Sequence, residues 1–269
     1  LTRLWMRFWD PSERLTAPAL CCAHISTLTA LRRLDLYDFG LSLAEEVVLT
    51  AWQHMENLTL SRTASRQDAA GLWGALWRLP RLTSLVSDSV GGQPSKMLRS
   101  TVSDFPQLAK LRLLYYSEPA LPQPLPTTLT SLDLYASDVR VVPTSPTLLS
   151  LSISKATSAT LECPGHLLAM TQLTELILDS CHLSELPAPL AALPALEKLS
   201  LSHNDLTDLP QDLACVGCLR GLVLYGNLLQ WVPRVLCTGA ASRLEYLNIR
   251  WTRGHPWEVD EVALRSSLP

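Results

Sequence analysis

The sequence predicts an α/β solenoid, in which short repeats stack and each repeat adds one strand to a parallel sheet. Three observations support this fold class. A pattern of leucines at alternate positions recurs along the chain, and its copies lie 19 to 30 residues apart. Apolar residues make up 47% of the 269 residues, and the chain has only 3 Phe and 6 Tyr. A composition that is rich in apolar residues but poor in Phe and Tyr favours many small, equivalent layers over a single irregular core.

Each copy follows the pattern Leu-x-x-Leu-x-Leu, with a small polar residue or Cys favoured at the ninth position. Positions 4 and 6 of a short strand point to one side of the sheet, and positions 3, 5 and 7 point to the other. One repeat alone cannot bury its leucines, so the repeats must stack. The eleven copies begin at Leu1, Leu31, Met55, Leu82, Leu108, Leu129, Leu148, Leu173, Leu196, Leu219 and Leu244.

The later repeats carry a second motif after the strand. Leu183, Leu186, Pro187 and Leu190 form the first copy of Leu-x-x-Leu-Pro-x-x-Leu within the segment 173–250. This segment resembles the leucine-rich-repeat family, in the 23-residue form of intracellular scaffolding and signalling members. The resemblance implies a curved horseshoe with a concave parallel sheet and a convex side that mixes helical and extended segments.

Shorter repeats interrupt this form, and the pairs Leu125-Pro126 and Val142-Pro143 resemble the compact repeats of bacterial effector proteins. We expect a single solenoid domain with four regions. They are degenerate long repeats at 1–107, short proline-rich repeats at 108–172, regular repeats at 173–252 and a C-terminal cap at 253–269. Because no polar cap precedes Leu1, we expect the chain to be part of a longer protein or to be closed by another subunit.

The long early repeats leave room for helices on the convex side, and we expect one at Gln67–Leu79. Several tryptophans fall on or near this side. If exposed, they mark a second interface, and if buried, they fill the wide repeats. The residues concerned are Trp52, Trp73, Trp77 and Trp231.

The ninth position normally holds Asn, whose amide can satisfy backbone groups in the turn after the strand. Asn204 and Asn227 fit this role. Smaller polar residues replace Asn at Thr63, Ser137, Cys181 and Thr252. Residues that cannot make the same bonds stand at Trp9, Phe39, Val90, Tyr116 and Ala156. The turns of these last repeats must therefore be satisfied in another way.

Aromatic and charged residues gather at positions 3, 5, 7 and 8, which should face the concave side. Tyr and Trp give a large contact area at low entropic cost and are frequent in binding hot spots. The alternative is that Tyr simply favours strands and that the charges form a solvated face with local ion pairs. The candidate protein-binding residues are Trp5, Arg7, Phe8, Arg33, Asp35, Tyr37, Arg112, Tyr115, Asp133, Tyr135, Tyr225, Tyr246, Arg250 and Trp251.

No motif in the sequence demands catalysis, a cofactor or a metal. Cys215-x-x-Cys218 lacks a second cysteine pair, and we expect it to serve packing. Cys181 is explained by its turn position and His182 by the loop that follows. His203 falls on the concave face, and the sequence places no nucleophile beside it. We therefore expect a protein that is not an enzyme.

The predicted function is a scaffold that binds a protein partner on its concave face. Two alternatives stay open: a structural subunit docked by its ends and convex face, and the recognition arm of a ubiquitin ligase or immune receptor. A formal charge of −3 without a basic cluster argues against nucleic acid, and no apolar run is long enough for membrane insertion. The 7 cysteines are odd in number and scattered, so we expect an intracellular, cytoplasmic protein.

Overall fold

The structure is a computed structural model that describes most of the strands and the turns around them. The described residues are 1–7, 20–21, 27–37, 41–42, 45–61, 76, 78–88, 105, 107–116, 120–121, 125–141, 145–156, 169–186, 193–210, 213, 218–229, 233, 236 and 243–249.

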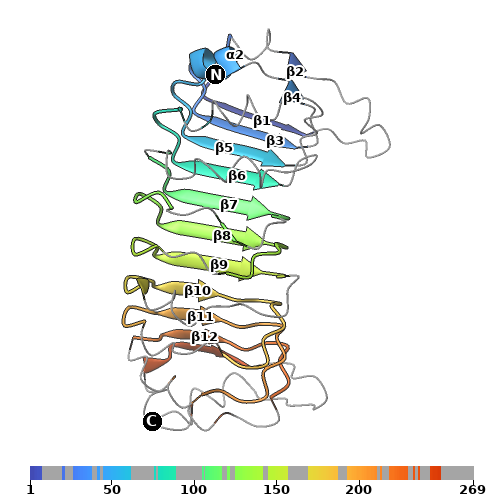
Figure 1. The fold of residues 1–269 in the computed structure, drawn as a ribbon, viewed down its shortest axis with the longest axis vertical. Coiled ribbons are helices and arrows are strands. Elements are labelled where there is room, and N and C mark those ends of the chain that lie inside the picture. The colour runs from blue at the N-terminus through green and yellow to red at the C-terminus, as the bar shows by residue number, and fades with distance from the viewer. Residues whose placement is uncertain are drawn as a thin grey trace, which may run out of the picture. The chain divides into compact units, whose positions relative to one another are not determined.

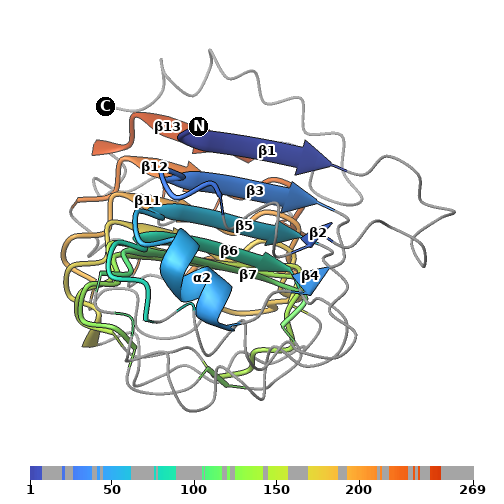
Figure 2. The same ribbon diagram turned by 90° about the horizontal axis from the view of Figure 1, so that it is seen from above.

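The chain forms two compact units, which we call the N-terminal unit (Leu1–Thr130) and the C-terminal unit (Ser131–Pro269). Five parallel strands build the sheet of the N-terminal unit in chain order (Figure 1). Figure 2 shows four of them, β1, β3, β5 and β6, running side by side in one direction. The strands are β1 (Arg3–Arg7), β3 (Arg33–Tyr37), β5 (Asn57–Ser61), β6 (Ser84–Asp88) and β7 (Lys110–Leu114).

Six further strands build the parallel sheet of the C-terminal unit, again in chain order. Each of the eleven predicted repeats therefore supplies one strand, and the predicted fold class is confirmed. That one solenoid continues across residue 130 stays a prediction. The strands are β8 (Ser131–Tyr135), β9 (Ser150–Ser154), β10 (Glu175–Ile177), β11 (Lys198–Ser200), β12 (Gly221–Val223) and β13 (Tyr246–Asn248).

The strands pair in the register that the repeat predicts. Arg33 at position 3 of β3 lies opposite Arg3 on one side and Asn57 on the other. In the C-terminal unit, Lys198 of β11 lies between Glu175 and Gly221 in the same way. Equal positions of successive repeats thus form straight columns across each sheet.

Positions 1, 4 and 6 form the core of both units. In the repeat that starts at Leu196, for example, the side chains of Leu196, Leu199 and Leu201 are at most 1% exposed. Replacing one such leucine by alanine typically costs 2 to 5 kcal/mol, roughly, because a cavity remains. The predicted leucine ladder is therefore the main source of stability.

The backbone turns at both strand ends also pair between repeats. The carbonyl of Glu197 at position 2 accepts hydrogen bonds from the N–H groups of Arg220 and Gly221 at 2.8 and 2.9 Å. At the other end, the N–H of His203 at position 8 donates to the carbonyl of Tyr225. The strand ladder is thus extended at both ends, which satisfies backbone groups that would otherwise be buried without partners.

Position 8 adopts a left-handed backbone conformation in six successive repeats. The φ angles lie between 49° and 75° at Tyr115, Ala136, Lys155, Ser180, His203 and Gly226. Only the last of these residues is a glycine, although the left-handed region costs other residues about 1 to 2 kcal/mol each. The turn is therefore imposed by the cross-repeat hydrogen bonds rather than by local preference.

Helix is a minor component of the described residues. Helix α2 (Glu45–Ala51) buries Val48 and Ala51 on one side and is followed by Trp52, which is fully buried. Trp52 therefore fills the wide repeat and does not mark an interface. A separate pair of short parallel strands consists of β2 (Leu20–Cys21) and β4 (Leu41–Ser42). Most of the predicted helix at 67–79, and Trp73, Trp77 and Trp231, lie outside the described residues.

Asn204 and Asn227 act at position 9 as predicted, but their bonds also join neighbouring repeats. The Asn204 side-chain oxygen accepts the N–H groups of Cys181 and Leu183 at 2.9 and 3.1 Å. Its amide nitrogen donates to the carbonyls of Leu178 and Leu201 at 2.7 and 3.0 Å. One buried side chain thus satisfies four backbone groups of two repeats.

The other position-9 residues use different means. The thiol of Cys181 donates to the carbonyl of Ile153 at 3.2 Å, one repeat earlier. The ring of Tyr116 is buried, and its hydroxyl donates to the carbonyl of Ala120 at 3.2 Å. These repeats therefore satisfy the turn by other means, as the sequence predicts.

Candidate functional site

The candidate site is the sheet face that bears positions 3, 5 and 7, opposite the leucine core. We call it the open face, and it corresponds to the predicted concave side. Alternation of burial along the strands shows it directly, since β7 and β8 have every second side chain buried. Side chains of neighbouring repeats stand about 5 Å apart on such a face and can act together.

Four of the predicted residues come together on β1 and β3 of the N-terminal unit. Trp5 is 63% exposed, and its ring centroid lies 6.3 Å from that of Tyr37. Arg33 Nε donates to Asp35 Oδ2 at 2.7 Å, and the Asp35 side chain is buried. Asp35 therefore orients Arg33 beside the aromatic pair and presents little surface of its own.

The Arg33–Asp35 pair also has an electrostatic consequence. The hydrogen bond to Asp35 and the charge of that carboxylate raise the pKa of Arg33 above its ordinary value. A raised arginine pKa stabilises the folded state at every pH below that ordinary value. Arg33 is therefore charged at all physiological pH values, and its charge does not make binding depend on pH.

The other open-face residues of this unit make it basic. Tyr115, just after β7, is 51% exposed. The strands of this unit carry two carboxylates at positions 3, 5 and 7, the buried Asp35 and Asp88 at the end of β6. The exposed cations at positions 3, 5 and 7 are Arg3, Arg7, Arg33, Lys110 and Arg112.

In the C-terminal unit, two of the predicted tyrosines have defined neighbours. Lys155 Nζ lies 5.1 Å from the ring centroid of Tyr135, a cation–π geometry, and Asp133 lies two residues before Tyr135 on β8. Tyr225 meets His203 of the preceding repeat edge to face at 4.8 Å. Both tyrosines are half-buried, so they line the open face more than they project from it.

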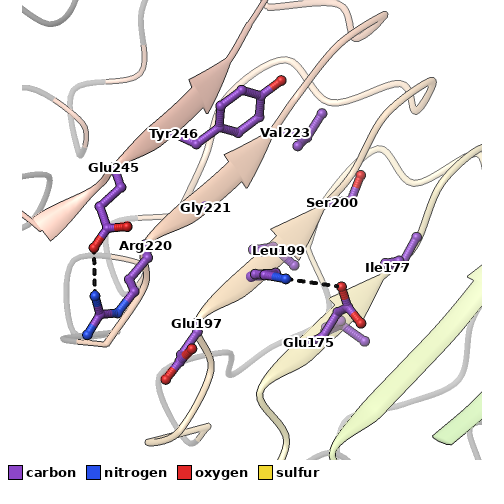
Figure 3. A pocket seen from close by; sticks show the side chains of 12 residues that line it. Glu175, Ile177, Glu197, Leu199, Ser200, Arg220, Gly221, Val223, Glu245 and Tyr246 are labelled. Carbon is purple, nitrogen blue, oxygen red and sulfur yellow. Dashed lines mark hydrogen bonds and ion pairs between the residues drawn. The ribbon is translucent and has the colours of Figure 1, made fainter.

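A hollow of about 400 Å³ lies on the open face over strands β10 to β13 (Figure 3). We call it the Gly221 hollow, because Gly221 occupies position 3 of β12 and leaves a gap there. The Tyr246 ring stands at one side and is 47% exposed, and Val223 lies beside it. Ile177 supplies a further apolar side chain on the β10 side.

Charged side chains surround this hollow at positions 2 and 3. Arg220 Nη1 lies 2.6 Å from Glu245 Oε1, and Lys198 Nζ lies 4.0 Å from Glu175 Oε1. The hydrogen bond to Glu245, with the charge of that carboxylate, raises the pKa of Arg220. Glu197 is the fifth charge, and it forms no ion pair with any residue in the described part of the chain.

Sequence reasoning placed only Tyr246 of this hollow among the binding residues. Glu175 and Lys198 fall on the predicted open face as part of its mixed charge, but nothing singled out Gly221. A signal was present, because Ile177 and Val223 are apolar at position 5, where the other repeats of the C-terminal unit carry Asp, Ser or Asn. A glycine at position 3 beside two apolar residues at position 5 indicates a hollow with an apolar base.

Phe8, Arg250 and Trp251 lie outside the described residues, as does Cys215. Among the residues that the structure describes, no group of three or more His, Cys, Asp or Glu could hold a metal ion. Likewise, no helix within the described ranges is long and apolar enough to cross a membrane.

Residues 171–229 match the family model for leucine-rich repeats. A comparison with curated proteins gave no significant match. Among solved structures, an internalin (inlF) of Listeria monocytogenes superposes with a TM-score of 0.61 at 19% identity, covering 84% of this chain and 62% of that one. The chain of the TLR13–ssRNA13 complex gives 0.60 at 20% identity, with 83% of this chain and 36% of that chain covered.

A leucine-rich-repeat protein of Leptospira interrogans gives a TM-score of 0.52 at 19% identity over 86% of this chain and 69% of that one. These likenesses show a shared fold, and this chain spans less than two thirds of the first two proteins. The fold commonly mediates protein–protein interaction and is typically non-enzymatic. The family match over residues 171–229 and the parallel strands of both units together support a leucine-rich-repeat protein.

Proposed function

We propose that the protein is a non-catalytic scaffold that binds a protein partner through the open face of its sheet. The observation that carries this proposal is the exposure of aromatic rings on that face. Trp5, Tyr115 and Tyr246 are 63%, 51% and 47% exposed and are the only aromatic side chains among the exposed large hydrophobic residues described. A large exposed ring is costly to keep in water and is favoured where a partner covers it.

The two units support two contact zones on this face. The first contains Trp5, Tyr37 and Tyr115 amid exposed cations, and the second contains Tyr246 at the Gly221 hollow. The burial of Trp52 removes one of the residues that favoured a structural subunit docked by its convex side. We further propose an intracellular location, which fits the Cys181 thiol acting as a hydrogen-bond donor.

The test is a quantitative affinity purification with mass spectrometry from extract of the source cells. We compare the wild-type chain with a Trp5→Ser/Tyr115→Asn variant and with a Tyr246→Ser variant. Asn tolerates the left-handed conformation of residue 115 better than most residues. We expect specific partners to be lost about tenfold or more from one or both variants, since a hot-spot residue contributes at least 1.4 kcal/mol, roughly.

The matched control is Leu149→Ser, which removes an exposed apolar side chain at position 2, outside the open-face positions. Partners that the aromatic variants lose and the control retains establish the open face as the binding surface. Unchanged partners in both aromatic variants would transfer the function to another surface. Treatment of the extract with ribonuclease separates protein partners from any that are recruited through RNA.

A further inference from the structure

We propose that the Gly221 hollow receives an apolar side chain of a protein partner whose neighbouring residue is lysine or arginine. This inference rests on the proposed function, and it names the chemistry that one part of the open face selects. Four features of the hollow support it. They are the missing side chain at Gly221, the apolar residues at the base, the strands that are paired on both sides, and the excess of carboxylates.

The space exists because position 3 of β12 has no side chain. On the neighbouring strands, the same position carries Lys198 and Tyr246. A Cβ built on Gly221 would meet only the Lys198 Cγ, at 3.7 Å, which is an ordinary contact. The backbone therefore does not require glycine there, and the absence of a side chain widens the hollow of about 400 Å³ over strands β10 to β13. That volume falls in the range of binding pockets.

The base of the hollow is apolar where the rest of the unit is polar. Ile177 and Val223 occupy position 5 and are half-buried. The same position holds Ser152 on β9 and, between the two apolar residues, Ser200 on β11, which also lines the hollow. The Ser200 hydroxyl donates to Asp179 Oδ1 at 2.7 Å and is therefore already engaged. A hydroxyl-bearing or charged side chain placed over Ile177 and Val223 would lose water without gaining a partner. An aliphatic or aromatic side chain would remove apolar surface from water at both partners.

The backbone at the hollow is already fully engaged in the sheet. Strands β10, β11 and β12 are each paired on both sides, so no strand edge is exposed there. A partner cannot bind by adding a strand at this point. Recognition at the hollow must therefore come from side chains, with one anchor inserted and its neighbours at the rim.

The charges decide which neighbour is favoured. Three carboxylates (Glu175, Glu197 and Glu245) face two cations (Lys198 and Arg220), so the lining has a net charge of −1. Arg220 pairs with Glu245 and Lys198 with Glu175, whereas Glu197 forms no ion pair among the described residues. Its charge acts on Arg220 from a greater distance, and its carboxylate can also attract a cation of the partner. Figure 3 shows Glu197 at the edge of the hollow, where a residue next to the anchor would lie. An acidic neighbour would instead be repelled by the excess of carboxylates.

The experiment uses a library of random twelve-residue peptides displayed in several copies on phage. Display in several copies detects peptides whose individual affinity is low, because the copies bind together with higher avidity. The 269-residue wild-type chain and a Gly221→Leu variant, which places a side chain in the hollow between Lys198 and Tyr246, are used as separate baits. The matched control is Ser131→Leu, which adds the same side chain at position 3 of β8, away from the hollow.

We expect the wild-type and Ser131→Leu baits to enrich peptides with an aliphatic or aromatic residue within two positions of Lys or Arg. The Gly221→Leu bait should not enrich this motif, although its midpoint of thermal unfolding should equal that of the wild type. Glu197→Gln should keep the apolar anchor and weaken basic synthetic peptides about tenfold, whereas Glu185→Gln, on the return segment, should leave them unchanged.

No enrichment on the wild type, or a motif that survives Gly221→Leu, would overturn the proposal. So would a motif in which the apolar residue has acidic neighbours. Failure here is distinct from failure of the proposed function. If cellular partners require Trp5, Tyr115 or Tyr246 but ignore Gly221→Leu, the open face binds protein and the hollow does not select it.

Discussion

Two glycines of the C-terminal unit, five residues apart, differ in what a side chain would meet. Gly226 has a φ of +75°, and a Cβ there would lie 2.7 Å from His203 Nδ1. Gly221 has no such restriction. We expect Gly226→Ala to lower the free energy of unfolding by about 2 kcal/mol, because the left-handed backbone and the clash both act against it. Gly221→Ala is the control and should raise it by about 0.5 to 1 kcal/mol, because alanine loses less backbone freedom than glycine in a strand.

Urea unfolding followed by circular dichroism measures both values. Equal stability of the two alanine variants would show that the turn at residue 226 does not need glycine.

Asn204 is a second residue whose substitution should destabilise both its own repeat and the preceding one. Its buried side chain bonds the N–H groups of Cys181 and Leu183 and the carbonyls of Leu178 and Leu201. We expect Asn204→Ala to lower the free energy of unfolding by about 3 kcal/mol, because several buried backbone groups lose their partners. Hydrogen exchange should accelerate at the amides of residues 181 and 183, in the preceding repeat. Faster exchange confined to residues 201–206 would contradict the cross-repeat role.

At the scale of the element, the turn after each strand repeats one unfavourable backbone geometry. Ala136 adopts a φ of 49° at position 8, where only Gly226 has the residue that suits it. We expect Ala136→Gly to raise the free energy of unfolding by about 0.5 kcal/mol, because relief of the left-handed conformation outweighs the greater entropy of glycine in the unfolded chain.

Ala109→Gly serves as the comparison, since Ala109 stands at position 2 without a positive φ. It should lower the free energy of unfolding by about 0.5 to 1 kcal/mol. A loss of stability in both variants would contradict the account of the turn.

The strands and their register could be predicted because each rests on a pattern of period 2 repeated eleven times. The role of Asn204 was predictable for the same reason. The left-handed position 8 was not, because Tyr115 and Lys155 give no local sign of it. It depends on hydrogen bonds from the next repeat. The Gly221 hollow escaped prediction because it consists of a missing side chain, and such a gap becomes visible only once the neighbouring strands are placed.

At the scale of the whole molecule, the open faces of the two units differ in charge. The strands of the N-terminal unit carry five exposed cations at positions 3, 5 and 7 against two carboxylates, Asp35 and Asp88. The Gly221 hollow instead has a net charge of −1, with Ile177 and Val223 at its base. Salt should therefore affect the two zones differently, since the Debye length falls from about 10 Å at 0.1 M to about 3 Å at 1 M.

Partners lost in the Trp5→Ser/Tyr115→Asn variant should weaken by more than about tenfold between these salt concentrations. Partners lost in the Tyr246→Ser variant should change less, because apolar burial resists salt. Biolayer interferometry on the purified partners measures both. The opposite order of salt sensitivity would contradict this assignment of the zones.

The central claim is that a protein partner covers the open face, and site-specific photo-crosslinking tests it most directly. A benzophenone amino acid replaces Tyr246 on the open face or, in a second variant, the exposed Glu185 on the return segment. The account predicts a covalent adduct with a partner protein from residue 246 and none from residue 185. An adduct from residue 185 alone would place the partner on the other side and contradict the claim.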